Sequence, residues 1–290
     1  MSAPTYNGLY INLDRSTDRR AAIEKRLAVL GLAQRYKRVR ATDGAALDRT
    51  SRLSPAVVAT FASHLAAIEE AAGSEVPTHI IEDDVLLSGS FVAAAQSLLQ
   101  RGALDRFDIV FTEMMLPPNL EGLKKLKVHL DAAKRARGPA ELVLQLQLLD
   151  LARLSFSGAT SYFLAPRGAG KIAAILKREW ESGPTLQVDN FIRREIQSRR
   201  ISGACLFPFV TSFDPHSLLN STIDPGPANE SAVVLGLLRY AFYIDADFAG
   251  AARAMLDEII QRMARERADP QREFLADVFS VVITDRFRLV

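Results

Sequence analysis

Apolar and polar positions alternate along the first half of the chain in a pattern that predicts strands separated by helices. Short apolar runs predict strands at 9–13, 36–41, 78–81 and 108–112. Apolar residues spaced three or four positions apart predict helices at 16–31, 54–73 and 91–99. This alternation is typical of α/β proteins with a mostly parallel sheet covered by helices.

The periodicity weakens from about 114 to 155 and then becomes regular again. We predict an insertion beside the sheet over 114–155, with helices at 120–135 and 142–151. The regular part that follows predicts a strand, two helices and a strand, at 161–164, 168–180, 188–200 and 205–210.

The last part of the chain predicts helices at 232–244, 248–267 and 270–282. We therefore expect an α/β domain over 1–224 and a helical C-terminal extension over 225–290. The apolar segment 232–244 is interrupted by Arg239 and is shorter than the roughly 20 residues that span a bilayer. We favour packing of this segment against the α/β domain, and leave open a homodimer through these helices or contact with a membrane surface.

Composition narrows the class of protein. Among the 290 residues, Lys and Arg exceed Asp and Glu by only two, and the basic residues form short groups, so we expect no nucleic-acid partner. Cys205 is the sole cysteine, which excludes an intrachain disulfide and a cysteine-based metal site. The first residues lack the basic start and apolar run of a secretory signal, and we expect a cytoplasmic location, with peripheral contact at the inner membrane left open.

Three consecutive acids, Glu82, Asp83 and Asp84, directly follow the apolar pair Ile80-Ile81. Ligands of open α/β sheets bind beyond the carboxyl ends of the strands, and crowded carboxylates there need a cation or hydrogen-bond donors. Carboxylate oxygens suit Mg²⁺ or Mn²⁺, which can also hold a diphosphate. A solvated acidic turn is the alternative explanation.

Two further features precede the triplet. Arg15 and Arg19 lie at the start of the first predicted helix, where cations oppose the helix dipole and an anion such as phosphate would relieve them. Ion pairs with Asp14 and Asp18 are the alternative.

His64 lies on the apolar stripe of helix 54–73, which points it toward the protein interior, as a core residue or a ligand.

The segment from Gly168 to Ala173 matches the loose glycine pattern of dinucleotide-binding loops, with Asp189 about 20 residues further on. Pro166 and Arg167 intervene after the predicted strand, and the match lies deep in the chain instead of opening the sheet. A nicotinamide-dependent oxidoreductase is therefore a weaker alternative.

Together these segments resemble glycosyltransferase family 25, the relatives of lipooligosaccharide and procollagen galactosyltransferases. The resemblance is carried, in the family's order, by Tyr10-Ile11-Asn12-Leu13-Asp14-Arg15 with Asp18-Arg19-Arg20, Ala41-Thr42-Asp43-Gly44, Ser63-His64-Leu65, Ile81-Glu82-Asp83-Asp84-Val85, Gly158–Leu164 leading to Gly168-Ala169, and Val188-Asp189-Asn190. The matching blocks span 6 to about 222 and leave the helical tail uncovered.

The resemblance implies a GT-A fold, which is Rossmann-like with a mostly parallel sheet, and transfer of a hexose, typically galactose, from a UDP-sugar to a glycan acceptor such as lipooligosaccharide. It also implies an inverting reaction that depends on Mn²⁺ or Mg²⁺. We expect Glu82 and Asp84 to bind the metal, with His216 as a third ligand, and Asp189 to act as general base. The expected donor-binding residues are Asn12, Asp14, Arg15, Arg19, Asp43, Gly44, His64 and Asp83. A non-catalytic relative with the same fold is a further alternative.

Overall fold

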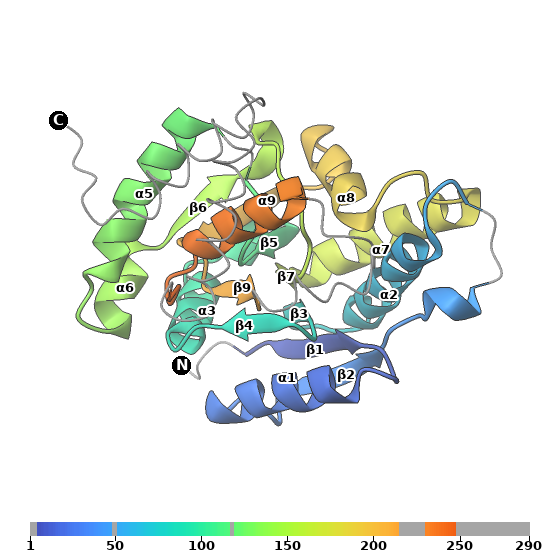
Figure 1. The fold of residues 1–290 in the computed structure, drawn as a ribbon, viewed down its shortest axis with the longest axis horizontal. Helices are drawn as coiled ribbons and strands as arrows, with labels where there is room; N and C mark the ends of the chain where they lie inside the picture. The colour runs from blue at the N-terminus through green and yellow to red at the C-terminus, as the bar shows by residue number, and fades with distance from the viewer. Residues whose placement is uncertain (1–4, 48–50, 117–118, 215–229, 248–290) are drawn as a thin grey trace.

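The computed structural model describes residues 5–47, 51–116, 119–214 and 230–247, which form a central sheet with helices on both faces (Figure 1). The strand order is β2-β1-β3-β7-β5-β8-β6. Only β7 and β6 run antiparallel to their neighbours. The strands are β1 (Asn7–Asn12), β2 (Tyr36–Arg40), β3 (Thr78–Glu82), β5 (Ile109–Phe111), β6 (Gln147–Asp150), β7 (Ser161–Leu164) and β8 (Gly203–Phe207). The predicted α/β, Rossmann-like GT-A architecture is confirmed.

Successive strand residues face opposite layers of helices, as the pleat requires. Leu9 and Ile11 of β1 belong to one core, and Tyr10 between them belongs to the other. The core of Leu9 is shared with α2 (Pro55–Ala72), α7 (Pro166–Ser182) and α8 (Val188–Gln197). The core of Tyr10 is shared with α1 (Thr17–Val29), α3 (Phe91–Gln100) and the short α4 (Ala103–Arg106). Two layers of helices therefore bury both faces of the sheet.

The segment expected as an insertion differs from its prediction. It contains α5 (Leu120–Lys134) and α6 (Pro139–Gln145), and the helix predicted over 142–151 is wrong beyond Gln145. Instead, β6 pairs antiparallel with β8 and adds an edge strand to the sheet. Leu148 packs into the core of Tyr10 and its neighbour Leu149 into the core of Leu9. Adjacent residues of a strand point to opposite faces of the sheet, which is how the two leucines reach different cores.

Two short strands and one helix complete the described part. β4 (Val85–Leu87) pairs antiparallel with β9 (Thr211–Phe213), which continues the chain beyond β8. The helix α9 (Glu230–Ala241) buries Leu237 and Leu238, followed by Phe242, in the core of Leu9, so the segment 232–244 packs against the α/β domain. No described helix has the length and apolar content needed to cross a bilayer. The helices predicted at 248–267 and 270–282 lie outside the described residues.

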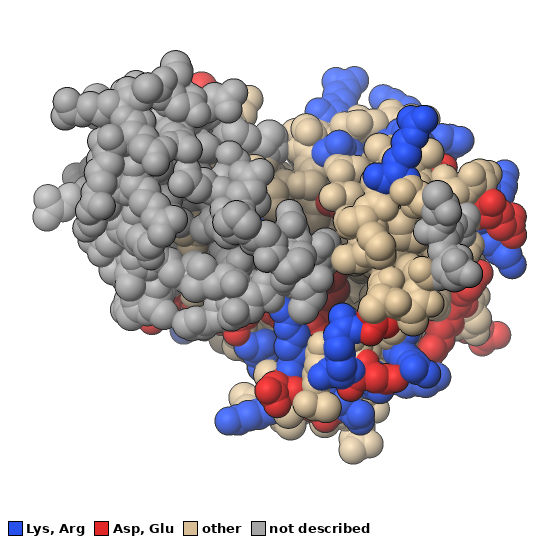
Figure 2. Space-filling model, turned by 45° about the vertical axis from the view of Figure 1, so that its right-hand side comes forward, with Lys and Arg blue, Asp and Glu red and all other residues tan. Residues whose placement is uncertain are grey.

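Charged side chains of both signs are interleaved on the face drawn in Figure 2. The lower part of that view, where α1 and β2 lie, mixes blue and red groups, in keeping with the ion pairs Arg20–Glu24 and Arg38–Asp14. In this lower part, the coloured residues therefore do not form a continuous basic surface.

A buried chain of hydrogen bonds crosses the sheet beneath these layers. His79 of β3 contacts the Tyr36 hydroxyl through Nδ1 at 2.5 Å and the Ser161 hydroxyl through Nε2 at 3.0 Å. Ser161 contacts Thr112 at 2.6 Å, and Thr112 contacts Thr211 at 2.8 Å. His79 is completely buried, and burial lowers its pKa to about 3. The ring is therefore neutral in the folded protein, with both nitrogens bonded.

The buried neutral His79 predicts how stability depends on pH. Its pKa is about 3 when folded and 6.5 in a model peptide, so below about pH 6.5 only the unfolded chain takes up the proton. This removes up to about 1.4 kcal/mol of unfolding free energy per pH unit as the pH falls. We expect His79→Gln to be less stable at pH 7 but to lose stability less steeply down to pH 4.5, measured by urea denaturation.

The matched control is His129→Gln, which removes an exposed histidine on α5 and should keep the wild-type pH dependence. A His79→Gln protein with the wild-type slope would show that His79 does not carry this effect.

Candidate functional site

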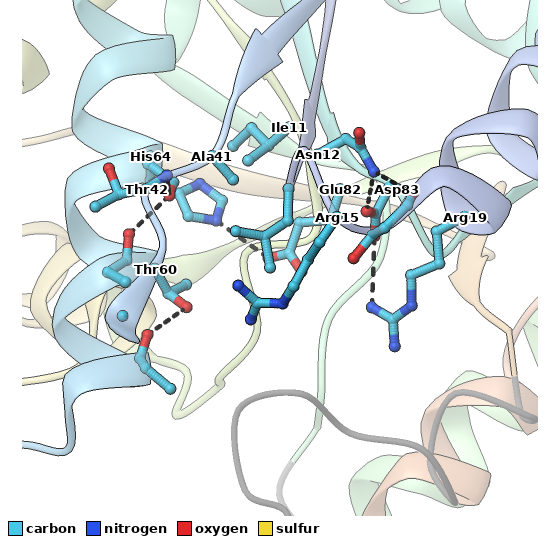
Figure 3. Close-up of a pocket in the computed structure, with 16 residues that line it drawn as sticks. Ile11, Asn12, Arg15, Arg19, Ala41, Thr42, Thr60, His64, Glu82 and Asp83 are labelled. Atoms are coloured by element: carbon cyan, nitrogen blue, oxygen red, sulfur yellow. Dashed lines mark hydrogen bonds and ion pairs between the residues drawn. The ribbon is translucent and has the colours of Figure 1, made fainter. Parts of the chain in front are cut away.

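The acid triplet lies where several strands end together. β1 runs parallel to both β2 and β3, with Ile11 opposite Glu82 in register. The segments that follow β1, β2 and β3 therefore leave the sheet at the same edge. They line a cavity with the first turns of α2, which we name the Arg15 cavity (Figure 3). Its polar lining residues are Asn12, Arg15, Ser16, Arg19, Thr42, Thr60, Ser63, His64, Glu82 and Asp83.

Asp83 holds the strand ends together. Its Oδ2 accepts a hydrogen bond from Asn12 Nδ2 at 2.6 Å, and Arg19 Nη1 lies 3.5 Å from its Oδ1. Asn12 is almost fully buried and also accepts a hydrogen bond from Arg38. Burial raises the pKa of Asp83, although the hydrogen bond from Asn12 and the charge of Arg19 oppose the rise. Asp83 thus orients Asn12 and Arg19 beside the cavity.

Glu82 points to the opposite side, toward α2 (Figure 3). Its Oε1 lies 3.1 Å from His64 Nε2, and His64 Nδ1 lies 2.9 Å from the Tyr162 hydroxyl. Burial raises the pKa of Glu82, but the His64 hydrogen bond and the charges of His64, Arg239 and Arg19 outweigh it, so the pKa is lowered. An ionised carboxylate only accepts, so His64 Nε2 donates the hydrogen bond to Glu82.

Asp84 is the least satisfied of the three acids. Its Oδ1 is buried without a hydrogen-bond partner among the described residues, and its Oδ2 lies 3.9 Å from Arg19 Nη1. Burial raises the pKa of Asp84 to about 7, and the charges of Glu82 and Asp83 add to the rise. A buried carboxylate oxygen beside two other acids requires a proton or a cation. Asp84 therefore has the chemistry of a cation ligand.

The two arginines expected to meet an anion both line the cavity. Figure 3 shows Arg15 and Arg19 on either side of Glu82 and Asp83. Arg15 forms an ion pair with Asp43, whose Oδ1 also accepts from the amide of Ala45 at 3.0 Å. This turn lies close against α2, because a Cβ on Gly44 would lie 2.9 Å from the Pro55 carbonyl oxygen. Glycine at 44 therefore brings the turn to the cavity wall.

Asp14 lies apart from this group. It bonds Arg38 and Arg40 at 2.6 Å each, and it is not among the residues that line the cavity. The Arg38 hydrogen bond lowers the pKa of Asp14. Asp14 is therefore explained by its surface ion pairs alone. Arg15 and Arg19 also form ion pairs, but in addition they line the cavity.

A second cavity, which we name the Asp189 cavity, adjoins the first. Glu82 and Thr60 line both, and its other polar side chains belong to Thr160, Gln187 and Asp189. Asp189 lies in the first turn of α8, where its Oδ2 accepts from the Gly158 amide at 2.7 Å and its Oδ1 from the Asn190 amide at 2.8 Å. Two backbone donors fix this carboxylate at the cavity wall.

The glycine segment that resembled a dinucleotide loop is part of a helix. Gly168 and Gly170 lie inside α7, which begins at Pro166, and a Cβ on Gly168 would lie 2.3 Å from the Asp108 carbonyl oxygen. β7 runs antiparallel to β3, so α7 starts at the edge opposite the acid triplet. Close packing of a helix on β5 explains Gly168, and the dinucleotide loop is wrong.

The expected metal ligands lie partly outside the described residues. No cluster of three or more His, Cys, Asp or Glu side chains suited to a metal occurs in the described ranges, and His216 lies outside them. The buried oxygen of Asp84, which has no hydrogen-bond partner among the described residues, has the chemistry of one ligand of a hard cation.

Two buried partners at this edge, Glu113 and Arg239, were not among the residues predicted from the sequence. Glu113 directly follows the strand predicted at 108–112, so the rule that singled out the triplet would also have found it. Arg239 interrupts an otherwise apolar helix, which is a signal for a buried and paired charge.

Comparison with known proteins identifies one family. The model described as Glycosyltransferase family 25 (LPS biosynthesis protein) matches residues 7–192. The matched stretch runs from β1 into α8 and contains the acid triplet, both arginines and Asp189. No curated protein matches the chain.

The contacts of Asp83 predict a selective loss of stability. Asp83→Ala removes the main acceptor of the buried Asn12 amide, and we expect a loss of about 1–3 kcal/mol of unfolding free energy in urea denaturation. Asp14→Ala removes only exposed ion pairs and should change stability little. Equal losses in the two variants would contradict the bridging role of Asp83.

Proposed function

The chain belongs to glycosyltransferase family 25, and on that premise we propose that it transfers a hexose, galactose, from a UDP-sugar to a glycan acceptor such as lipooligosaccharide. The observation that carries the proposal is the buried Asp84 oxygen, which has no partner among the described residues, at a sheet edge where Arg15 and Arg19 line the adjoining cavity. This combination suits a ligand that brings both phosphate oxygens and a cation.

The Arg15 cavity is the donor site in this proposal. Arg15 and Arg19 supply guanidinium groups for a diphosphate, and the N-terminus of α1 begins beside them at Thr17. Ser16, the residue that caps this helix, lines the cavity and makes no side-chain bond to the first turn. A diphosphate there gains from both the helix dipole and the arginines.

We propose that Mn²⁺ or Mg²⁺ binds with the donor, held by Asp84 and by the oxygen of Glu82 that does not face His64. When bound, the ion stabilises negative charge on the departing diphosphate. His64 fixes the orientation of Glu82, and Asp83 keeps Arg19 at the cavity. His216 as a further ligand stays a prediction.

The Asp189 cavity is the acceptor site in this proposal. Asp189 takes the proton from the attacking acceptor hydroxyl, while the anomeric carbon–oxygen bond to UDP breaks and its electron pair stays on the diphosphate. The two cavities meet at Glu82 and Thr60, so donor and acceptor approach from different sides. This arrangement supports a single displacement with inversion.

The donor proposal predicts a metal-dependent thermal shift. We expect UDP and one of UDP-galactose, UDP-glucose or UDP-N-acetylglucosamine to raise the melting temperature with Mn²⁺ and much less without it. Mass action adds about 2.7 kcal/mol at a hundredfold excess over Kd. Asp84→Asn should lose the Mn²⁺-dependent part of the shift.

Asp14→Asn is the matched control, since both carboxylate oxygens of Asp14 are paired with Arg38 and Arg40, and it should keep the shift. A shift with NAD alone, or none with any uridine nucleotide, would overturn the proposed donor.

The general-base proposal predicts a separation of binding from turnover. We expect Asp189→Asn to retain the Mn²⁺-dependent shift in melting temperature with UDP. Its rate of UDP release from the donor should fall at least about 100-fold, because general-base catalysis contributes about 10²–10⁴-fold to the rate. The measurement is UDP release, with water or a saccharide as acceptor.

Asp150→Asn is the control, because Asp150 also accepts a backbone hydrogen bond, from Ala152, but does not line the Asp189 cavity. Rapid turnover by Asp189→Asn would remove Asp189 from the role. UDP binding without any wild-type turnover would instead favour a non-catalytic relative.

A further inference from the structure

A buried ion pair links α9, the last helix of the described residues, to the edge of the sheet that carries the acids. Glu113 is fully buried and Arg239 of α9 is 6% exposed. The Arg239 guanidinium donates to both carboxylate oxygens of Glu113 and to the Thr160 hydroxyl, which itself donates to Glu113. The three side chains form one closed hydrogen-bonded group.

Such a pair is an inefficient way to stabilise a fold. Two charges lose their hydration on burial, and packed hydrophobic residues of similar volume are often as stable or more stable. α9 already packs through Leu237, Leu238 and Phe242, so it does not depend on Arg239 for contact with the core. The role of the pair must therefore be sought in its position in the structure.

The pair lies against the backbone segment 158–160, which connects the two carboxylates of the site. The Thr160 carbonyl oxygen accepts from the Glu82 amide at 2.8 Å, and the Gly158 amide donates to Asp189 at 2.7 Å. Gly158 has a φ of 90°, and a Cβ there would lie 3.5 Å from Arg239 Nη1. Glu82, Gly158, Thr160 and Asp189 all line the Asp189 cavity.

We propose that Arg239, together with Glu113, is a positioning residue of the transfer site. The pair fixes segment 158–160, and that segment sets the distance and orientation between Glu82 on the donor side and Asp189 on the acceptor side. Arg239 lies beyond the matched residues 7–192, so the C-terminal part of the chain completes the site. This inference rests on the proposed function.

The test measures the rate of UDP release by the full chain, with Mn²⁺ and with water as acceptor. The donor is UDP-galactose, UDP-glucose or UDP-N-acetylglucosamine. Arg239→Met should lower kcat by at least about tenfold, since a displacement of about 1 Å can cost about 100-fold, while the donor KM changes by less than about threefold. Arg239→Lys keeps the positive charge but loses the bidentate hydrogen bonds to Glu113, so its kcat should lie between those of Arg239→Met and the wild type.

Arg200→Met is the matched control, because Arg200 contacts both oxygens of Glu195, a buried acid that lines neither cavity. It should keep the wild-type kcat whatever its melting temperature. If Arg239→Met does not fold, Glu113→Gln provides the same measurement with the guanidinium retained.

The outcomes separate the two proposals. Wild-type kcat in folded Arg239→Met or Glu113→Gln, or an equal fall of kcat in Arg200→Met, would overturn the positioning role while leaving the transferase proposal intact. A wild-type protein that neither binds UDP nor releases it from any of these donors would overturn the proposed function, and the positioning role with it.

Discussion

Three adjacent carboxylates at the end of β3 set the main electrostatic constraint on this protein. Burial of a carboxyl group raises its pKa, and neighbouring negative charges raise that pKa further. The surrounding structure meets this cost differently at each position: Asn12 and Arg19 compensate Asp83, and His64 compensates Glu82. Asp84 keeps a buried oxygen without a partner in the described ranges. The compensation is therefore incomplete at Asp84, which is the position of the proposed cation.

The topology explains why the compensating groups are available. Parallel strands end at the same edge, so residues far apart in sequence, such as Asn12 and Asp83, become neighbours there. Glu113 follows β5 and reaches this edge by the same rule. β7 runs the other way, and its beginning, not its end, brings Thr160 to Glu82. One antiparallel strand thus delivers the segment that contacts both Glu82 and Asp189.

The sequence predicted what depends on local pattern. The apolar run along β1 predicted a strand, and the alternation of strands with helices predicted a sheet covered by helices. The end of that pattern at β3 located the acid triplet. The strand β6 was missed because it is stable only when paired with β8, and its two leucines suit either a helix or a strand locally. Propensity cannot decide such a segment without its partner.

The ion pair of Glu113 and Arg239 was hidden for the same reason, since 126 positions separate its members. Its location has a physical consequence for the site. A carboxylate held only by backbone amides, as Asp189 is, can move as far as those amides move. The Gly158 amide belongs to a glycine in the left-handed region, where the backbone has no Cβ to restrict it. A rigid, charged hydrogen-bonded group beside Gly158 supplies the restraint that this residue lacks, which explains why a buried charge pair is placed there in preference to apolar packing.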